Sequence, residues 1–508
     1  MSGPPARLDT SAHDREPTEE SHDPRRRRFE RYAGGHRARA DDRALRHPRP
    51  SPDSRRHAVI DIIPAEIPRT DAVLPPVNQT NVRRAAWAGL IGTALENFDF
   101  TIYGTASAII FSRLFFPNVS PAVGVIASFG AYAIGFGARP LGGLFFSKFG
   151  DHLGRKFVMV ATLFLMGSAT FAIGLLPTYA TAGIWAPILL VMCRFLQGFG
   201  AGAEQAGGIV LLTETAARGK RGRYSSLVFV GAAAGAAMGA IVWILVQMMP
   251  KEALDSYGWR LVFFSSIFVT FAAWVIRRRM AESPVFTELK TEGVIERQAR
   301  KPVGDVVKNG RRGLVRVFFM NVGANAHSYI FQVFLGSYLI NQLAVDPKLI
   351  PKFLLIGALC ACVSAVTFGT LSDKFGRRRM YLIVTGFLLL FPVPAFLMMT
   401  SGNLFLIALV IVIGFVMASQ GTVGVQAAYF PELFGSRYRY AGVAIGREFS
   451  SVFGGGIAPL ICGALLTAAT GSWWPVAIYM MVMMGISFFT AYHSPETVDR
   501  DLLTEQDA

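Results

Sequence analysis

The stretch Gly-Asp-His-Leu-Gly-Arg-Lys at residues 150–156 has a second version later in the chain, Ser-Asp-Lys-Phe-Gly-Arg-Arg at 372–378. Their aspartates, Asp151 and Asp373, are 222 residues apart, and the Thr-Glu and Pro-Glu dipeptides that follow them are 218 residues apart. Because two separate landmarks recur at nearly the same offset, the sequence indicates a duplicated unit. Internal duplication of this kind is typical of secondary transporters.

The sequence on both sides of these motifs consists of long apolar runs. Hydrophobic residues make up 52% of the 508 and charged residues only 17%, and the mean hydropathy is +0.40, which excludes an ordinary series of soluble domains. A helix of about 20 residues crosses the ~30 Å of a bilayer core. Runs of that length lie at 85–111, 121–147, 157–177, 184–213, 224–249, 259–276, 313–343, 349–371, 380–400, 403–430, 440–469 and 473–492. The sequence therefore predicts an all-α integral membrane protein with twelve transmembrane helices in two six-helix pseudo-symmetric halves.

The net charge of +16 is concentrated in alternate loops of this arrangement. Lysine and arginine cluster in the loops after the second, fourth, sixth, eighth and tenth runs and are sparse in the others. The positive-inside rule places these loops and both termini in the cytoplasm. We expect a multi-pass protein of the bacterial inner (plasma) membrane that is surrounded by lipid, and we do not interpret the basic residues as a nucleic-acid footprint.

Five segments are expected from these patterns. They are an Arg-rich cytoplasmic extension at 1–84, a six-helix bundle at 85–276, a cytoplasmic loop at 277–312, a second six-helix bundle at 313–492 and a cytoplasmic tail at 493–508. The extension holds 17 arginines, no lysine and 13 acidic residues, a composition that favours disorder. Its Arg25–Arg28 run could contact nucleic acid or anionic lipid, but a solvated extension is the simpler interpretation.

The repeated loops are candidate gates. Glycines allow sharp turns there, the aspartates can cap or pair at a helix end, and Arg155 and Arg377 can reach Glu214 and Glu432. Such pairs could close one side of the protein in one state and break in the other. The alternative is that these residues only determine topology. The candidate gating residues are Arg139, Gly150, Asp151, Gly154, Arg155, Glu214, Asp373, Gly376, Arg377, Glu432 and Arg439.

Ionisable residues at membrane depth are functional candidates because their burial costs several kcal/mol. Glu96, Asp99 and Tyr103 recur at i, i+3 and i+7 on one helical face. Two neighbouring carboxyl groups in a low dielectric resist simultaneous ionisation, so one of them can take and release a proton. The alternative is a buried carboxylate that holds a structural partner.

Further polar residues follow the helical period in other runs. Arg194 can bind a carboxylate through two hydrogen bonds, although pairing with an acidic residue of the first run is an equal alternative. His327 is a second proton-site candidate, with a satisfied structural histidine as the alternative. The candidate substrate-binding residues are Arg194, Tyr103, Tyr132, Gln197, Asn321, Asn325, Gln332 and Gln426. The candidate proton-coupling residues are Glu96, Asp99, His327 and Glu204.

The chain resembles the major facilitator superfamily, whose loop signature it matches twice, and specifically the metabolite:proton symporter branch with its proline/betaine, shikimate and alpha-ketoglutarate permeases. The matching stretches are Leu-Glu-Asn-Phe-Asp-Phe-Thr-Ile-Tyr-Gly (95–104), Arg-Pro-Leu-Gly-Gly-Leu-Phe-Phe (139–146), Gly-Ile-Trp-Ala-Pro-Ile-Leu-Leu (183–190), Gly-Trp-Arg (258–260) and Glu-Ser-Pro-Val-Phe (282–286). Two positions depart from the branch: Asn97 replaces an aromatic residue, and Ala203 and Gln205 flank Glu204 where the branch has glycine and an aromatic residue. These departures leave the substrate open.

The resemblance implies a monomeric secondary transporter that works by alternating access. We expect proton-coupled symport of a small polar metabolite, either an organic acid or a zwitterionic osmolyte. The alternatives are a proton-driven exporter and a membrane receptor or scaffold. No P-loop, HExxH or GxSxG element is present, so an enzyme is not expected. The four cysteines fall within apolar runs and predict neither a disulfide framework nor a metal site, and no cofactor is expected.

Overall fold

The computed structural model describes residues 79–508, apart from residues 154, 203, 204, 279–302, 437, 503 and 505. Every regular element in this part of the chain is a helix. Most of the predicted extension at 1–84 and of the loop at 277–312 lies outside the described residues. Gly154 and Glu204 also lie outside them, as do the side chains of Asp151 and Arg155, and Gly150 is described only by its helical backbone.

The first half follows the order predicted from the apolar runs. Its elements are α1 (Gln79–Ala106), η1 (Ser107–Phe111), α2 (Ser112–Phe115), α3 (Pro121–Leu153), α4 (Arg155–Leu175), α5 (Tyr179–Ala182), α6 (Trp185–Ala201), α7 (Gln205–Thr215), α8 (Arg221–Ser225), α9 (Leu227–Val246), α10 (Lys251–Ala253), η2 (Leu254–Gly258), α11 (Trp259–Phe264) and α12 (Ser266–Arg278). Helix α1 begins before the predicted start of the first span at residue 85.

The second half repeats this order. Its elements are α15 (Val303–Asn309), α16 (Arg311–Tyr329), η3 (Ile330–Phe334), α17 (Leu335–Asn341), η4 (Pro347–Leu349), α18 (Ile350–Phe375), α19 (Arg377–Leu390), α20 (Pro392–Thr400), α21 (Leu404–Ile413), η5 (Gly414–Gly421), α22 (Thr422–Glu432), α23 (Arg439–Ser451), η6 (Val452–Gly456), α24 (Ile457–Ala468) and α25 (Trp474–Tyr492). A π-helical turn follows the first long helix of each half, at η1 and at η3, so the duplication extends to an irregularity of the backbone.

The membrane-spanning segments agree with the sequence. Seven helical segments of the described residues are long and apolar enough to cross a membrane, and the bent pair α19–α20 would be an eighth. Two shorter apolar helices, Val160–Leu175 and Trp185–Ala201, match the third and fourth predicted spans. The remaining two predicted spans coincide with α1 and with α16–α17, whose polar residues lower their hydropathy. The fold is the predicted twelve-helix arrangement.

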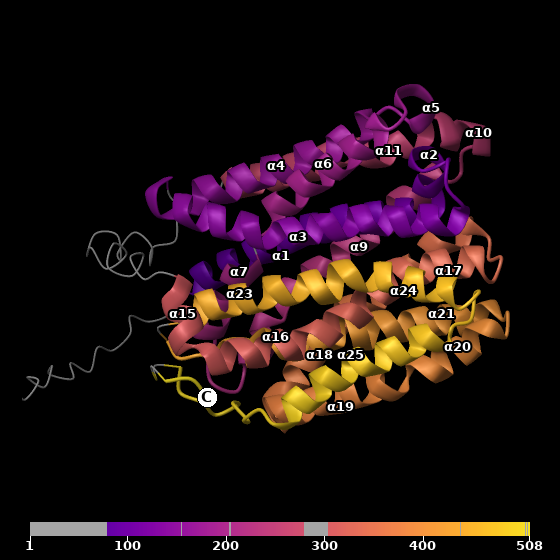
Figure 1. The fold of residues 1–508 in the computed structure, drawn as a ribbon. Coiled ribbons are helices and arrows are strands. Elements are labelled where there is room, and N and C mark those ends of the chain that lie inside the picture. The colour runs from indigo at the N-terminus through magenta and orange to yellow at the C-terminus, as the bar shows by residue number, and fades with distance from the viewer. Residues whose placement is uncertain are drawn as a thin grey trace, which may run out of the picture. The chain divides into compact units, whose positions relative to one another are not determined.

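Helices α3 and α6 approach each other through glycines within the first half, where they run side by side in Figure 1. A Cβ added at Gly198 would lie 1.8 Å from the carbonyl oxygen of Gly135, and one added at Gly142 would lie 1.8 Å from that of Phe199. Neither carbonyl group can move away from an added Cβ unless the two helices separate. This close contact fixes the position of Arg194 on α6 relative to α3.

We expect Gly198→Ala to destabilise the protein, because the added methyl group would force α3 and α6 apart; overpacking of this kind costs roughly 1–3 kcal/mol. Thermal unfolding of the purified protein in detergent measures the effect. Gly137→Ala on α3 is the matched control, since a Cβ there meets nothing within 4 Å. Equal melting temperatures for the two variants would contradict the assigned close approach.

Candidate functional site

A chain of buried polar side chains links α1, α4 and α6. The Thr170 hydroxyl donates to Asp99 Oδ2 at 2.8 Å, and Gln197 Nε2 donates to the Thr170 hydroxyl at 2.7 Å. The Gln197 Oε1 atom accepts a hydrogen bond from Arg194 Nη1. All four side chains are buried. Asp99 and Arg194 are therefore joined through two intermediate side chains. A change in the charge of one alters the electrostatic environment of the other.

Aromatic rings surround the Arg194 guanidinium. Its central carbon lies 3.9 Å from the Tyr103 ring centroid, 5.0 Å from that of Tyr132 and 5.3 Å from that of Phe100. Such cation–π contacts hold the planar group in one orientation. Arg194 Nε and Nη2, the hydroxyls of Tyr103 and Tyr132 and Asp99 Oδ1 have no hydrogen-bond partner in the structure. We call Asp99, Phe100, Tyr103, Tyr132 and Arg194 the Arg194 site; it has buried donors available for an anion.

Glu96 belongs to a different network, although it lies only one helical turn from Asp99. Arg139 Nη1 donates to Glu96 Oε1 at 2.5 Å, while Arg139 Nε and Nη2 donate to the two carboxylate oxygens of Glu448 at 2.8 and 3.1 Å. The two carboxyl groups of α1 thus engage separate arginines. Arg139 joins the halves of the protein, because Glu448 is on α23 of the second half.

The predicted polar residues of the second half lie mainly in contacts between its own helices. Asn321 donates to Ser450 at 2.7 Å and Asn325 to Ser451 at 3.0 Å. Gln332 donates to Ser419 at 3.2 Å, which connects η3 with η5.

Gln426 and His327 also contact other parts of the second half. Gln426 donates to the Tyr381 hydroxyl at 3.0 Å. The Nδ1 atom of His327 contacts the Gly323 carbonyl of its own helix at 3.2 Å, and the ring also lies near the Leu388 backbone on α19. His327 therefore lies outside the Asp99 network, and its Nε2 atom has no hydrogen-bond partner among the described residues.

The repeated motif of the second half forms a buried network at the end of the bundle that carries the C-terminus, on the left in Figure 1. Arg377 Nε and Nη2 donate to the Glu432 carboxylate at 3.1 and 3.3 Å, and Arg377 Nη2 lies 2.7 Å from Asp373 Oδ1. Gly376, with φ of 98°, makes the turn before α19. We call Asp373, Arg377, Glu432 and Arg439 the gate network.

The gate network contacts the first half at several points. The Asp373 carboxylate accepts from the backbone N–H groups of Gly222 and Arg223 at 2.8 and 2.9 Å. Arg439 Nη1 donates to Glu214 at 2.8 Å. The structure therefore pairs Arg377 with Glu432 as predicted, whereas Glu214 pairs with Arg439.

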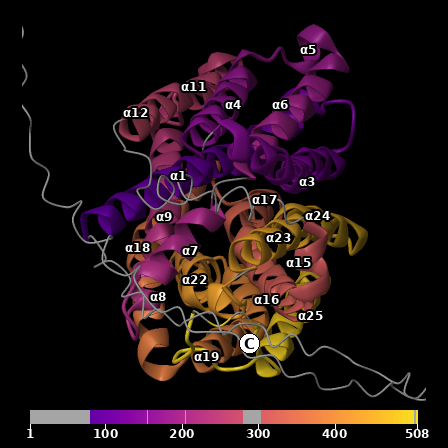
Figure 2. The same cartoon turned by 90° about the vertical axis from the view of Figure 1, so that its left-hand side faces the viewer.

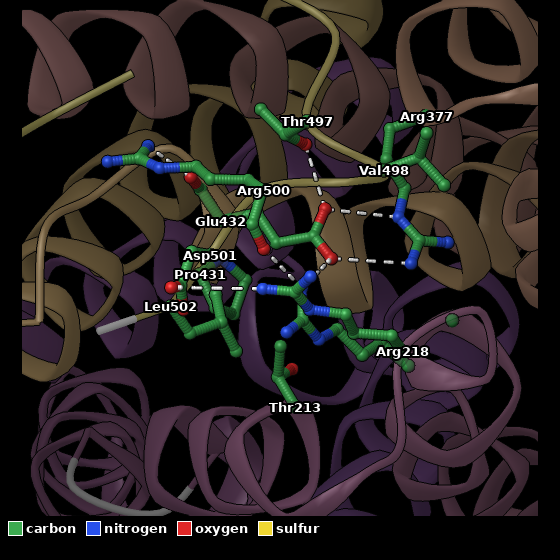
Figure 3. A network of polar contacts seen from close by, with 12 residues as sticks. Thr213, Arg218, Arg377, Pro431, Glu432, Thr497, Val498, Arg500, Asp501 and Leu502 are labelled. Carbon is green, nitrogen blue, oxygen red and sulfur yellow. Dashed lines mark hydrogen bonds and ion pairs between the residues drawn. The ribbon is translucent and has the colours of Figure 1, made fainter. Parts of the chain in front are cut away.

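The C-terminal tail covers this network. Thr497 donates to the Glu432 carboxylate at 2.8 Å and Arg500 Nη1 to the Glu432 backbone carbonyl at 2.5 Å, as Figure 3 shows. Arg221 Nη1, from the first half, donates to the Arg500 carbonyl at 2.8 Å. These contacts have no periodic signal in the sequence, because the described part of the tail is not helical. Thr170 and Glu448 were also missed as site members.

Duplicated helical halves that bury charged side chains between them define a membrane transporter of the two-bundle kind. Residues 89–459 match the model of the Major Facilitator Superfamily, and the chain belongs to that superfamily. The superfamily members that this chain matches are transporters and not enzymes. The prediction that the protein is not an enzyme is therefore confirmed.

Two relatives and one solved structure illustrate the likeness. The chain is 36% identical to the shikimate transporter of Escherichia coli (strain K12) over 81% of this chain and 94% of that protein. It is 31% identical to the proline/betaine transporter of Salmonella typhimurium (strain LT2), covering 84% and 86% of the two chains. The fold is similar to a partially occluded, inward-open structure of the E. coli xylose transporter XylE, with a TM-score of 0.62 and 15% identity over 83% of this chain and all of that one.

Proposed function

We propose that the protein is a proton-coupled symporter that imports a small organic acid by alternating access. The observation that carries this proposal is the Arg194 site: a fully buried guanidinium has two nitrogens without hydrogen-bond partners, beside two tyrosine hydroxyls that also lack partners. A carboxylate satisfies such donors in a two-point arrangement. The hydroxyls of the two tyrosines can form hydrogen bonds with hydroxyl groups of the ligand.

The same geometry favours an organic acid over a betaine-type zwitterion. Quaternary ammonium groups are recognised by the faces of aromatic rings. In the Arg194 site these faces already pack against the arginine, with 3.9 Å between the guanidinium carbon and the Tyr103 ring centroid. The relative named for shikimate, a hydroxylated carboxylic acid, agrees with this preference.

Asp99 is the proposed coupling carboxyl group. While it is ionised, it competes electrostatically with the substrate for Arg194, through the chain of Thr170 and Gln197. A proton on Asp99 removes this competition and leaves the guanidinium charge to the substrate carboxylate. Loss of the proton then weakens substrate binding, so the two species move together. One proton with one monocarboxylate carries no net charge across the membrane.

The test is uptake of radiolabelled hydroxylated carboxylic acids and of glycine betaine into right-side-out vesicles, with and without an inward proton gradient. Because one pH unit corresponds to about 1.4 kcal/mol, we expect it to support roughly tenfold accumulation of an acid. A protonophore should abolish this accumulation. Net proton-driven efflux, or uptake of betaine alone, would overturn the proposal.

We expect Asp99→Asn to lose proton-driven accumulation but to retain exchange of labelled for unlabelled acid, because the amide mimics the protonated carboxyl group in shape and charge. Vesicle uptake and counterflow measure the two activities. Glu252→Gln, at an exposed position on α10, is the matched control and should accumulate substrate like the original protein. Full accumulation by Asp99→Asn would exclude Asp99 as the coupling group.

A further inference from the structure

The contact of Arg139 with Glu448 belongs to a larger charged cluster between the halves. Arg139 and Glu96 come from the first half, and Arg447 and Glu448 come from the second. All four are buried, and Arg447 is within electrostatic range of Glu448, Arg139 and Glu96. We call these four residues the clamp cluster. It holds two positive and two negative charges, one of each sign from each half.

The cluster lies between the Arg194 site and the gate network. Along α1 it is one turn before Asp99, and along α3 Arg139 is one turn beyond Gly135, whose added Cβ would lie 3.2 Å from Arg194 Nη2. Along α23, Glu448 is nine residues beyond Arg439, about 14 Å at 1.5 Å per residue. Phe100 stands between the two arginines, with its ring centroid 5.3 Å from the Arg194 guanidinium carbon and 5.6 Å from that of Arg139.

Close packing of the two halves seals the cluster on one side. A Cβ added at Gly456 on η6 would lie 2.6 Å from Phe136 Cβ on α3, and the rings of Phe136 and Tyr329 are 5.0 Å apart. Figures 1 and 2 show α3 running beside α23 and α24. Since the halves meet here through closely packed side chains, the cluster must separate whenever the halves part at this level.

The charges in the clamp cluster determine the conditions under which the two halves can separate. In a medium of low dielectric, the two carboxylates hold Arg139 and Arg447 near each other although they are on opposite halves. If one carboxylate takes a proton from water, its O–H bond forms and one ion pair with Arg139 is lost. The cluster is then left with a net charge of +1. Two arginines facing each other across the interface, with a single carboxylate between them, repel.

We propose that Glu448, together with Glu96, forms a proton-controlled clamp between the halves, separate from the gate network and from the substrate site. Protonation of Glu448 removes the ion pair that joins Arg139 to the second half and favours separation of the halves on the side of the gate network. Protonation of Glu96 removes a neutralising charge from the same cluster. The other titratable groups that face the cluster are Tyr132 on α3, Tyr329 on α16 and Asp99 one turn away on α1. Glu204, on the segment before α7, lies outside the described residues.

The experiment measures the distance between spin labels on the two halves of the full-length protein in lipid nanodiscs without substrate. Labels at Lys220→Cys and Lys374→Cys, both exposed and at the gate end, report separation. In a background with the four native cysteines replaced by alanine, we expect acidification from pH 8 to pH 5.5 to increase the separated population. Glu448→Gln should show at least a tenfold larger separated population at pH 8 and a reduced response to pH.

Two further variants keep the test decisive if Glu448→Gln folds poorly. Glu448→Asp retains the charge and should restore the pH response. The exchange Arg139→Glu with Glu448→Arg preserves the cluster's composition and should behave better than Arg139→Glu alone. Glu252→Gln is the matched control. Identical distance distributions in Glu448→Gln and the original protein at both pH values would overturn the clamp.

The clamp rests on the proposed function only where it is applied to transport, and the two can fail separately. If no organic acid is transported, the label distances still test the clamp. If acids are transported and the distances do not depend on Glu448, the clamp fails while the proposed function stands.

Discussion

Arg194→Lys is expected to lower the rate of organic-acid uptake at low substrate concentration by about 30- to 150-fold. A lysine ammonium group can neither stack on Tyr103 as a plane nor present two fixed N–H groups to one carboxylate. The loss of one charge-assisted hydrogen bond in a buried site is worth roughly 2–3 kcal/mol, and each 1.4 kcal/mol corresponds to a factor of ten. The affinity for substrate, measured by equilibrium binding to the purified protein, should weaken by a similar factor.

The matched control is Arg260→Lys on α11. Arg260 is also packed on an aromatic ring, with its guanidinium carbon 4.4 Å from the Trp259 centroid. Its Nη1 donates to the carbonyls of Gly174 and Leu176, at 2.8 and 2.5 Å, which makes it a structural arginine. The substitution should change thermal stability and leave substrate affinity unchanged. If Arg194→Lys binds and transports like the original protein, the substrate carboxylate is bound elsewhere.

The fold could be predicted from the sequence because its main determinants are local. Each apolar run of membrane length forms a helix in the structure, since a bilayer leaves no other way to satisfy the backbone. The offset between Asp151 and Asp373 predicted the duplication that η1 and η3 repeat at the level of the backbone. The spacing of Glu96, Asp99 and Tyr103 also placed them correctly on one helix.

Pairings between helices could not be predicted in the same way. Sequence spacing places Glu96 and Asp99 on one face, but it does not show that Glu96 pairs with Arg139 whereas Asp99 is linked to Arg194 through other side chains. These links depend on how α3, α4 and α6 are placed against α1. Glu448 is 309 residues from Arg139, and periodicity carries no information about such a pair. The tail contacts of Thr497 were missed for the same reason, because they depend on where an irregular segment crosses the end of the bundle.

Glu432→Gln is expected to open the gate end of the protein, because Glu432 neutralises arginines from both halves. Its carboxylate accepts from Arg377, and Arg221 of the first half lies 3.7 Å away. The pair that crosses the halves, Arg221 with Glu432, has side chains only 7% and 0% exposed, and removing one member of a buried ion pair costs about 3–5 kcal/mol. Asp373 would remain as the acidic partner of Arg377. The closed arrangement should lose at least a hundredfold in population relative to the open one, measured with the label pair at Lys220→Cys and Lys374→Cys.

Glu214→Gln provides the comparison that separates burial from charge. Glu214 also pairs with an arginine, Arg439, at 2.8 Å, but its side chain is 44% exposed. Exposed ion pairs contribute about 0–1 kcal/mol because water screens them, so the same chemical change should shift the population less than about fivefold. A large shift in both variants would mean that the number of charges across the interface controls opening. A large shift in Glu432→Gln alone would mean that the buried ion pairs of Glu432 keep the gate end closed. Both halves and the C-terminal tail contact this one carboxylate.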